Sequence, residues 1–308
     1  MGGVIRSHVR RTPLLHFSDP DTGVDMHLKL ENLQWNGAFK VRPAAALMES
    51  VTTSELAAGV CTASSGNFGI AVAALAARRG IPATVVVPHT APAAKLERLQ
   101  RYGARVLKVS QEKWWETILT RHCDGVPGLY FDAVADTRAQ AGGGTIGLEI
   151  LEDLPDVDTV LVPFGGGGLV CGISAGMKAI RPRVRVIACE SELATPLAAA
   201  MHAGRPVTVP CHPGFVSGIG AASVLPDMWP LLQQLIDDVV VMSLTDIAAA
   251  IRTLALHGHV VAEGAGAVSV AAARTGRCSP GRTVCVISGG NIGAGALATI
   301  LAGQVPEA

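Results

Sequence analysis

Charged and aromatic residues are scarce in this chain, and neither sign of charge is in excess. Of its 308 residues, 16% are charged and 4% are aromatic, with 25 lysines and arginines against 25 aspartates and glutamates. No long run of basic residues occurs. Because nucleic acids and anionic membrane surfaces bind basic patches, the sequence disfavours both as partners.

Long apolar runs and paired cysteine motifs are missing as well. No stretch approaches the roughly 18 continuous apolar residues that a membrane-spanning helix needs. The N-terminal residues lack the apolar core of a signal peptide. The seven cysteines form no CxxC motif and no Cys/His spacing typical of a metal site. We therefore expect reduced thiols and a cytoplasmic location, with Cys61, Cys189 and Cys285 in the core because they lie in apolar runs.

Short β-branched runs alternate with alanine-rich runs along most of the chain. Residues 84–87 and 283–287 are apolar throughout, which is typical of parallel strands covered by helices on both faces. The predicted fold class is therefore α/β. The expected strands span residues 26–31, 59–63, 83–87, 104–109, 129–131, 158–163, 184–189, 238–242 and 282–287. The expected helices span residues 40–50, 67–79, 92–101, 111–122, 138–151, 169–180, 193–203, 244–257, 264–275 and 291–303.

Four consecutive glycines, Gly165, Gly166, Gly167 and Gly168, separate the apolar run 159–164 from a helical stretch. Because glycine has no Cβ atom, such a turn can direct several backbone N–H groups inward. The N-terminus of the following helix adds partial positive charge. The glycine turn (residues 165–168) therefore predicts a bound phosphate.

Three further motifs lie at strand ends or helix starts. Residues 31–42 place Lys40 at the start of a helix, where a cation is disfavoured and is either solvated or loses its charge through chemistry. Residues 64–69, Ser-Ser-Gly-Asn-Phe-Gly, form a donor-rich turn that suits a carboxylate. Residues 288–291, Ser-Gly-Gly-Asn, follow the last strand. Because ligands of parallel sheets bind at the carboxyl ends of strands, the turns at residues 64–66, 165–168 and 288–290 are expected to line one cleft.

In content and order, the four motifs resemble the fold-type II pyridoxal-phosphate enzymes, in the branch of the serine/threonine dehydratases and serine racemases. Matching stretches at residues 11–14, 144–149 and 262–267 extend the resemblance over nearly the whole chain. The resemblance implies a tryptophan synthase β-like fold of two lobes, each a twisted, mostly parallel sheet covered by helices. It implies a small domain over residues 53–137 and a large domain from residues 1–52 and 138–308, with the cofactor, pyridoxal 5'-phosphate, between them.

The resemblance also implies roles for single residues. Lys40 would form a Schiff base with the cofactor aldehyde, and its freed amine would remove the Cα proton of the substrate. Ser288 would face the pyridine nitrogen, where a neutral hydroxyl favours elimination over transamination. The other residues implied to contact the cofactor are Phe39, Asn67, Gly165, Gly166, Gly167, Gly168, Leu169, Gly218 and Glu263. The residues implied to bind the substrate carboxylate are Ser64, Ser65, Gly66 and Asn67.

Two of these roles have structural alternatives. Ser64 or Ser65 would also suit the N-cap of the following helix. Glu263 would also be stabilised simply by lying at a helix N-terminus.

The implied function is β-elimination, which converts L-serine, L-threonine or a related β-hydroxy amino acid to a 2-oxo acid and ammonia. A racemase of the same fold is the first alternative, because Ser65 stands where the serine racemase has its acid/base serine and many dehydratases have alanine. A cysteine-synthase-like β-replacement enzyme is a second alternative, although its usual Thr-Ser-Gly-Asn-Thr loop differs from residues 64–68. A non-catalytic binding protein is the third, and Lys40 argues against it because a pure binder needs no reactive amine.

Several positions depart from the dehydratase pattern. Phe68 stands where many relatives have histidine, Pro43 where a glycine is expected and Gly143 where a glutamine is usual. Glu190 and the carbonyl of Ala194 match part of the divalent-cation site of the racemase branch, but Pro196 replaces its second carboxylate, so no tight metal site is expected. The chain ends soon after the fourth motif, so an allosteric C-terminal domain is not expected either. The many apolar residues predict a homodimer.

Overall fold

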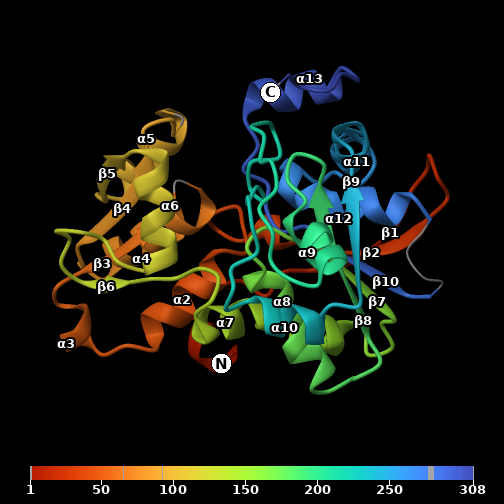
Figure 1. Cartoon of the computed structure of the whole chain (residues 1–308). Helices are drawn as coiled ribbons and strands as arrows, with labels where there is room; N and C mark the ends of the chain where they lie inside the picture. Colours follow the sequence, from red (N-terminus) through yellow and green to blue (C-terminus); the bar gives the residue numbers. More distant parts are fainter. Residues whose placement is uncertain (1, 65, 92, 277–280, 308) are drawn as a thin grey trace. The chain divides into compact units, whose positions relative to one another are not determined.

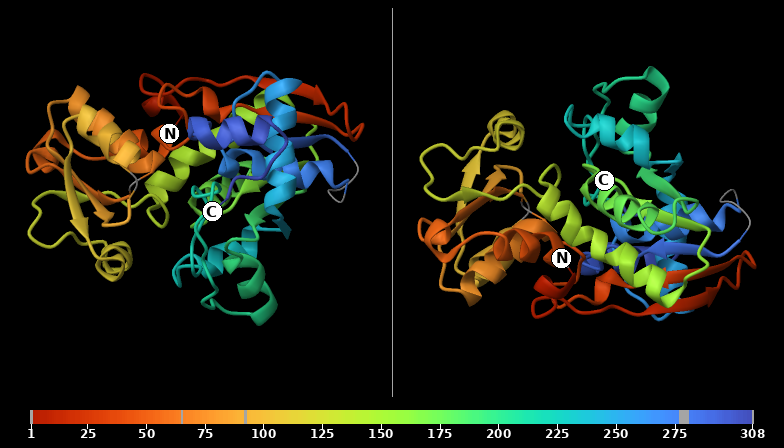
Figure 2. Two further views of the ribbon diagram at one scale, coloured as in Figure 1. Left: turned by 90° about the horizontal axis from the view of Figure 1, so that it is seen from above. Right: turned by 90° about the horizontal axis from the view of Figure 1, so that it is seen from below.

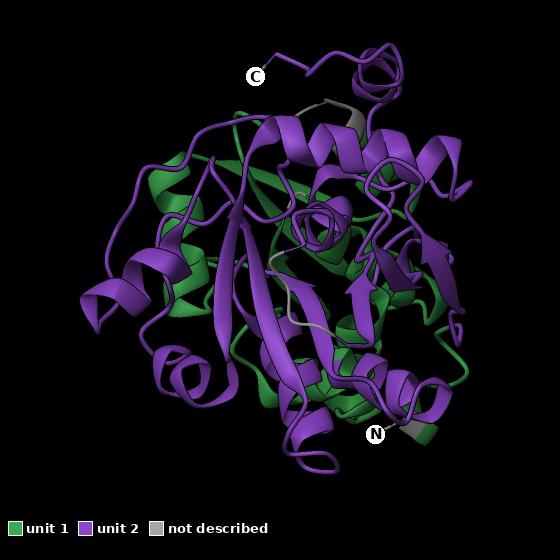
Figure 3. Cartoon of the chain, turned by 90° about the vertical axis from the view of Figure 1, so that its right-hand side faces the viewer, with its two compact units in different colours: residues 1–9, 40–143 green, residues 10–39, 144–308 purple. Residues whose placement is uncertain are grey.

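The computed structural model describes residues 2–64, 66–91, 93–276 and 281–307. The chain divides into two compact units, shown in green and purple in Figure 3. Unit 1 consists of Met1–Val9 and Lys40–Gly143, and unit 2 consists of Arg10–Phe39 and Gly144–Ala308. The predicted small domain, residues 53–137, lies within unit 1, and its functional boundaries stay a prediction.

Unit 1 contains a four-stranded parallel sheet with the order β5-β4-β3-β6 (Figure 1). Its strands are β3 (Val60–Ala63), β4 (Ala83–Pro88), β5 (Arg105–Val109) and β6 (Leu129–Tyr130). Its helices are α1 (Gly2–Ile5), α2 (Val41–Glu49), α3 (Thr53–Leu56), α4 (Asn67–Arg78), α5 (Ala93–Arg101) and α6 (Gln111–Thr120). Helix α7 (Thr137–Asp153) begins in this unit and ends in unit 2.

Helices cover both faces of the sheet of unit 1. A Cβ at Gly69 of α4 would lie 3.1 Å from the side chain of Val85, so α4 packs on the face that Val85 occupies. The next residue along β4, Val86, points to the opposite face and packs in a cluster with Trp114 and Ile118 of α6. This burial on both faces explains why these strands are apolar throughout.

Unit 2 contains a six-stranded sheet with the order β1-β2-β10-β7-β8-β9, in which only β1 is antiparallel to its neighbour. Its strands are β1 (Leu14–Ser18), β2 (Asp25–Lys29), β7 (Thr159–Pro163), β8 (Arg185–Ser191), β9 (Asp238–Met242) and β10 (Thr283–Val286). Its helices are the 3₁₀-helix η1 (Glu31–Leu33), α8 (Gly168–Lys178), α9 (Pro196–Ala203), α10 (Trp229–Leu235), α11 (Leu244–Leu256), α12 (Gly264–Arg274) and α13 (Ala294–Leu301).

The core of unit 2 lies on both faces of its sheet. Helices α11 and α12 pack on the face that carries Leu161 of β7, Ile187 of β8 and Cys285 of β10. The alternate residues of these strands point to the other face, where α8 contacts β7 and β8. In Figure 2, α11 and α12, in blue, are nearer the viewer in the view from above, and α8, in green, is nearer in the view from below.

The structure confirms the α/β class and every strand and helix expected from the sequence, with shifts of a few residues at their ends. It adds β1, α1, α3, η1 and α10, which the sequence analysis did not predict. Cys61, Cys189 and Cys285 are buried, as predicted. Over the described residues, no helix combines the length and the apolar character needed to cross a bilayer.

Candidate active site

Lys40 follows a loop that is fixed to the end of the last strand of unit 2. The backbone N–H of Phe39 donates to the carbonyl of Ser288 at 2.9 Å, and the N–H of Gly290 donates to the carbonyl of Gly37 at 2.9 Å. The Asn291 side chain adds a bond to the carbonyl of Asn36 at 3.0 Å. These bonds fix the backbone immediately before Lys40.

Lys40 itself is the N-cap residue of α2 in unit 1. Its Nζ atom lies 5.8 Å from the centre of the ring of Phe68, which is buried. Desolvation by burial lowers the pKa of the Lys40 ammonium to about 8, and the Asp132 carboxylate opposes part of that shift. A lysine that loses its proton this easily can act as a nucleophile and as a base.

The turn between β3 and α4 presents backbone N–H groups at the start of a long helix. Gly66 is the N-cap of α4, and no side chain caps this end, so the alternative of Ser64 as the N-cap is wrong. A Cβ at Gly69 would lie 2.0 Å from the carbonyl oxygen of Ser64, so the turn requires glycine there. Asn67 begins the helix, whose first turn carries no acidic residue. Ser65 lies outside the described residues.

The glycine turn connects β7 to α8, as predicted. Gly167 is the N-cap of α8 and has a positive φ of 96°, which favours glycine. A Cβ there would lie 3.3 Å from the ring of Phe164, and a Cβ at Gly165 would lie 3.2 Å from Cα of Ile219. No side chain caps α8, and its first turn, which includes Leu169, contains no acidic residue. A helix N-terminus of this kind fits a phosphate group.

The remaining predicted residues of unit 2 form a continuous neighbourhood with the glycine turn. A Cβ at Gly165 would lie 3.7 Å from the carbonyl oxygen of Gly218, and a Cβ at Gly218 would lie 3.9 Å from a carboxylate oxygen of Glu263. The N–H of Glu263 donates to the carbonyl of Gly289 at 3.0 Å. The Ser288 hydroxyl, which is buried, donates to the carbonyl of Ala265 at 3.3 Å.

The predicted residues therefore fall into two groups, one in each unit. Unit 2 brings together Phe39, the glycine turn, Gly218, Glu263 and Ser288. Unit 1 carries Lys40, Ser64, Gly66 and Asn67. In both groups several candidate residues follow parallel strands at their carboxyl ends, Ser64 after β3, Gly165 after β7 and Ser288 after β10, where ligands of such sheets bind.

Sequence reasoning placed Gly37 and Asn291 within the motifs at residues 31–42 and 288–291 but assigned neither of them a role. Gly37 has a φ of 80°, and a Cβ there would lie 2.6 Å from a side-chain oxygen of Asn291. The Asn-Gly pair at residues 36–37 is typical of a tight turn, so this pair could have predicted the turn before Lys40. No sequence pattern predicts that the Asp132 carboxylate raises the pKa of Lys40, because the two residues are far apart in the chain.

Glu190, the metal candidate, lies at the end of β8 and is fully buried. Its two carboxylate oxygens accept hydrogen bonds from the backbone N–H groups of Leu197, at 2.8 Å, and Ala198, at 2.9 Å, in the first turn of α9. Ala194 forms an isolated bridge with Ser191. Within the described ranges, no three His, Cys, Asp or Glu side chains gather in a group that could hold a metal ion. In this structure Glu190 caps a helix.

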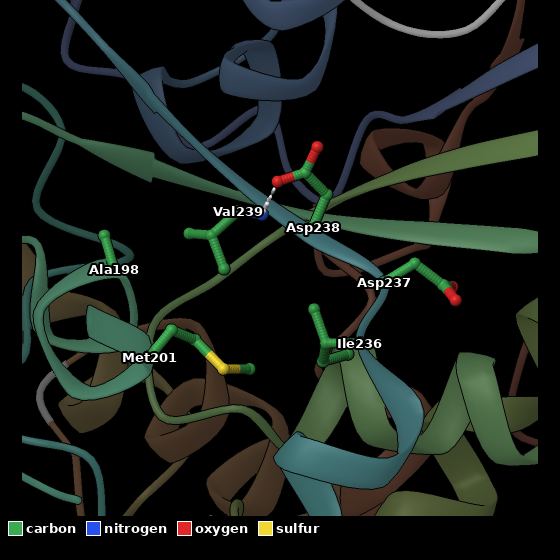
Figure 4. A pocket seen from close by; sticks show the side chains of 6 residues that line it. All are labelled: Ala198, Met201, Ile236, Asp237, Asp238 and Val239. Atoms are coloured by element: carbon green, nitrogen blue, oxygen red, sulfur yellow. Dashed lines mark hydrogen bonds between the residues drawn. The ribbon is translucent and has the colours of Figure 1, made fainter. Parts of the chain in front are cut away.

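A separate pocket of about 310 Å³ lies at the opposite end of β9 from the strand's carboxyl terminus. Met201 and Ile236 point toward each other across it (Figure 4). The Asp237 carboxylate accepts from the N–H of Val186 at 2.7 Å and pairs with Lys178 at 2.8 Å, so its charge is compensated. This pocket contains none of the predicted site residues. Its lining residues are Ala198, Met201, Ile236, Asp237, Asp238 and Val239.

Comparison with known proteins agrees with this geometry. The profile of the pyridoxal-phosphate-dependent enzymes matches residues 5–289. The chain is 38% identical to the L-threonine ammonia-lyase of Geobacter sulfurreducens over 94% of this chain and 73% of that protein. It is 33% identical to a serine racemase of Oryza sativa subsp. indica over 95% of this chain and 89% of that protein. The solved structure of maize serine racemase superposes with a TM-score of 0.88 at 32% identity, over 98% of this chain and 94% of that chain.

These matches cover nearly the whole chain. The residues at the strand ends also fit pyridoxal phosphate, the cofactor of the matched family. The glycine turn and the uncapped start of α8 suit a phosphate, and Lys40 has a pKa suited to bonding an aldehyde. The chain therefore belongs to the fold-type II pyridoxal-phosphate-dependent enzymes, in the branch of the threonine ammonia-lyases and serine racemases.

Proposed function

We propose that this protein is an ammonia-lyase that acts on L-threonine, L-serine or a related β-hydroxy amino acid and releases a 2-oxo acid and ammonia. The observation that carries the proposal is the buried residue Ser288, which follows β10 and bears a neutral hydroxyl, in a chain 38% identical to L-threonine ammonia-lyases. A neutral donor at the ring nitrogen leaves a weaker electron sink than an aspartate does. It therefore favours loss of a β-substituent over transamination.

Residues of the strand ends and helix starts hold the cofactor and the substrate in this proposal. The N–H groups of the glycine turn and of Leu169 bind the phosphate. The Ser288 hydroxyl turns its proton from the Ala265 carbonyl to the pyridine nitrogen when the cofactor is bound. Asn67 donates to the ring hydroxyl. The N–H groups around Ser64 and Gly66 bind the substrate carboxylate at the start of α4.

The other residues of unit 2 shape the cofactor side of the site. Glycine is needed at both Gly165 and Gly218 because a Cβ would lie 3.2 Å from Cα of Ile219 or 2.7 Å from Cβ of Ala265. Glu263 lies at the N-terminus of α12, and Phe39 fixes the approach to Lys40 through its bond to Ser288.

Lys40 performs the proton chemistry. Its lowered pKa leaves a useful fraction of neutral amine at physiological pH, which is the form that bonds the cofactor aldehyde. When bound, pyridoxal phosphate supplies an electron sink that stabilises the negative charge left on Cα. Freed when the substrate amine takes its place, the Lys40 amine would remove the Cα proton as a general base, and the β-hydroxyl would take up a proton and leave as water. Hydrolysis of the released enamine would then give the 2-oxo acid and ammonia.

A serine-type racemase is the second candidate, and specific observations favour it. Serine racemases are among the relatives at 33% identity, and maize serine racemase has a TM-score of 0.88. The sequence has a serine at position 65, where a racemase needs a second acid/base residue on the face of the substrate opposite Lys40. Replacing Ser65 with alanine would remove racemisation and preserve elimination.

One assay distinguishes the lyase from the racemase. The holoenzyme is incubated with a panel of β-hydroxy amino acids, and ammonia, 2-oxo acid and the chirality of the recovered substrate are measured. Release of 2-oxo acid and ammonia in equal amounts supports the lyase. Inverted substrate without 2-oxo acid supports the racemase, and no turnover of any member of the panel contradicts both.

Lys40→Ala tests the central residue of the proposal. We expect this variant to lose turnover and the visible absorbance of the lysine-bound cofactor, and borohydride should attach no cofactor to it. The matched control is Lys108→Ala, which removes an exposed lysine of β5 and should change neither property. Unchanged absorbance in Lys40→Ala would exclude Lys40 as the attachment point.

We further propose that the protein works as a cytoplasmic homodimer. Large apolar side chains remain exposed on the single chain, among them Ile180, Val261 and Leu256. Sedimentation of the holoenzyme at a twofold chain mass would support the dimer, and a monomer at micromolar concentration would contradict it.

A further inference from the structure

Two buried cysteines of unit 1 lie side by side although they are far apart in the sequence. Cys61 is in β3, and Cys123 is in the segment between α6 and β6. Their side chains are 2% and 3% exposed and belong to one small core cluster. The Cys123 thiol donates a hydrogen bond to the sulfur of Cys61, so the two sulfur atoms are in direct contact.

The fold holds both thiols on the same face of the sheet. Cys61 and Ala63 alternate with Thr62 along β3 and therefore point together into the cluster under α6. At the end of α6, Arg121 has a positive φ of 55° and turns the chain back, which places Cys123 over the sheet. The N–H of Val126 donates to the carbonyl of Cys123 at 3.1 Å and holds this segment.

We propose that Cys61 and Cys123 form an intramolecular disulfide when the protein meets hydrogen peroxide, which makes this pair an oxidation site in unit 1. The Cys61 thiolate attacks one peroxide oxygen, the O–O bond breaks, and hydroxide leaves while Cys61 becomes a sulfenic acid. The Cys123 sulfur then attacks the Cys61 sulfur, the S–S bond forms, and the S–O bond breaks. The second hydroxide leaves and takes the remaining thiol proton. Two thiols are oxidised by two electrons in total, and one peroxide is reduced to two waters.

The hydrogen bond between the thiols sets the order of the two steps. Donation from Cys123 lowers the pKa of the Cys61 thiol, and the same bond raises the pKa of Cys123. Because the thiolate is the nucleophile, Cys61 reacts first and Cys123 resolves the sulfenic acid. A resolving thiol in direct contact protects Cys61 from further oxidation.

The bond would join β3 to the segment after α6. Cys61 lies three residues before Ser64, and its carbonyl accepts from the N–H of Phe131 at 2.8 Å. The disulfide would therefore fix the strand that leads into the turn before α4. The proposal depends only on the placement of the two thiols and not on the proposed reaction.

Trp114 provides a local probe for this site. It packs against the cluster that contains both cysteines, and its ring N–H is buried without a hydrogen-bond partner. A disulfide in the cluster should quench the fluorescence of Trp114. Trp114→Phe should remove most of the fluorescence change without changing the oxidation itself.

The experiment uses the full chain with its cofactor in a background of Cys211→Ser and Cys278→Ser, because Cys211 is exposed and would form bonds between molecules. The protein is treated with stoichiometric hydrogen peroxide, and the remaining thiols and the peptide masses are measured without reduction. We expect the loss of two thiols, a mass lower by two hydrogen atoms, and one cross-linked peptide that contains both cysteines. Dithiothreitol should reverse all three changes.

Single variants provide the controls. Cys123→Ala should leave Cys61 to accumulate as sulfinic acid, and Cys171→Ala, which removes a buried cysteine outside the cluster, should still form the disulfide. If a variant folds poorly, peptide mapping of the protein that keeps both Cys61 and Cys123 still shows whether the two form a disulfide. Two intact thiols after peroxide treatment, or a cross-link between other cysteines, would overturn the proposal.

Discussion

In the proposed function, Lys40 serves the chemistry at the expense of stability. An ordinary lysine has a pKa near 10.5, and desolvation lowers this value to about 8 in the folded protein. The neutral amine that reacts with an aldehyde is therefore available near physiological pH. The cost is a largely desolvated cation in the cofactor-free protein below pH 8.

The first prediction concerns the rate at which the cofactor-free protein captures pyridoxal phosphate. Because only the neutral amine reacts, this rate should rise with pH to a midpoint near 8, as stopped-flow absorbance can measure. Asp132→Asn should move the midpoint to lower pH, because the Asp132 carboxylate raises the pKa of Lys40. A midpoint near 10.5 would show that Lys40 behaves as an exposed lysine.

The second prediction is that Lys40→Met stabilises the cofactor-free protein at pH 7. The shift from 10.5 to about 8 corresponds to roughly 3 kcal/mol of unfavourable free energy in the folded state. Since the unfolded chain binds more protons between pH 8 and 10.5, the wild-type free energy of unfolding should rise with pH through that window. Urea unfolding of both proteins at pH 7 and pH 10.5 would test this, and an equal difference at both pH values would contradict it.

At the scale of an element, Glu190 at the start of helix α9 is a second desolvated group whose pKa makes stability depend on pH. The carboxylate binds two N–H groups of the helix, yet desolvation by burial outweighs these bonds and raises its pKa to about 7. The folded protein therefore binds more protons than the unfolded chain between pH 4.5 and 7. Its stability should fall as pH rises through this window.

The third prediction is that removing the Glu190 carboxylate weakens this fall in stability between pH 4.5 and 7. Glu190→Gln keeps an oxygen acceptor for the helix and removes the titration, so the fall in stability between pH 4.5 and 7 should shrink by roughly 3 kcal/mol. Glu190→Ala should remove the titration too but lose the cap, at a cost of about 1 kcal/mol. Both effects can be measured by urea unfolding at several pH values. An unchanged pH profile in Glu190→Gln would contradict the assignment.

The fourth prediction compares two helical glycines. A Cβ at Gly266 of α12 would lie 2.2 Å from the carbonyl oxygen of Gly289, which cannot move without displacing Ser288. Gly266→Ala should therefore cost about 1–3 kcal/mol and weaken cofactor binding. Gly295 of α13 is exposed with nothing within 4 Å of its Cβ position, so Gly295→Ala should stabilise by about 1 kcal/mol. Thermal unfolding and cofactor titration of both variants test the comparison.

Features set by local composition could be predicted from the sequence, whereas contacts between distant residues could not. The continuous apolar strands and the glycines after β7 predicted both the fold class and the phosphate turn, because local composition determines both. Strand β1 was missed because it is an edge strand in which only Phe17 is buried, so no apolar pattern marks it. The capping of α9 by Glu190 and the contact of Cys61 with Cys123 depend on residues far apart in sequence, which no local pattern records.

At the scale of the whole molecule, both units use the same construction. Each has a parallel sheet, and in each the candidate residues follow strands at their carboxyl ends: Ser64 after β3, Gly165 after β7 and Ser288 after β10. Helix N-termini without side-chain caps follow two of these strands, at α4 and α8. Such ends leave backbone N–H groups available to anions, which suits a substrate carboxylate and a cofactor phosphate.

The last prediction concerns solubility. The chain carries 25 basic and 25 acidic residues and a formal net charge of zero at pH 7, so long-range repulsion between molecules is minimal there. Its solubility at low salt should pass through a minimum near pH 7. Among the described residues, Ile180 is the most exposed large apolar side chain, at 66%, and Ile180→Glu should raise solubility at pH 7 by adding charge. Ile180→Ser removes the same apolar surface without charge. Equal gains from both variants in a precipitation assay would attribute the effect to apolar contact rather than to charge.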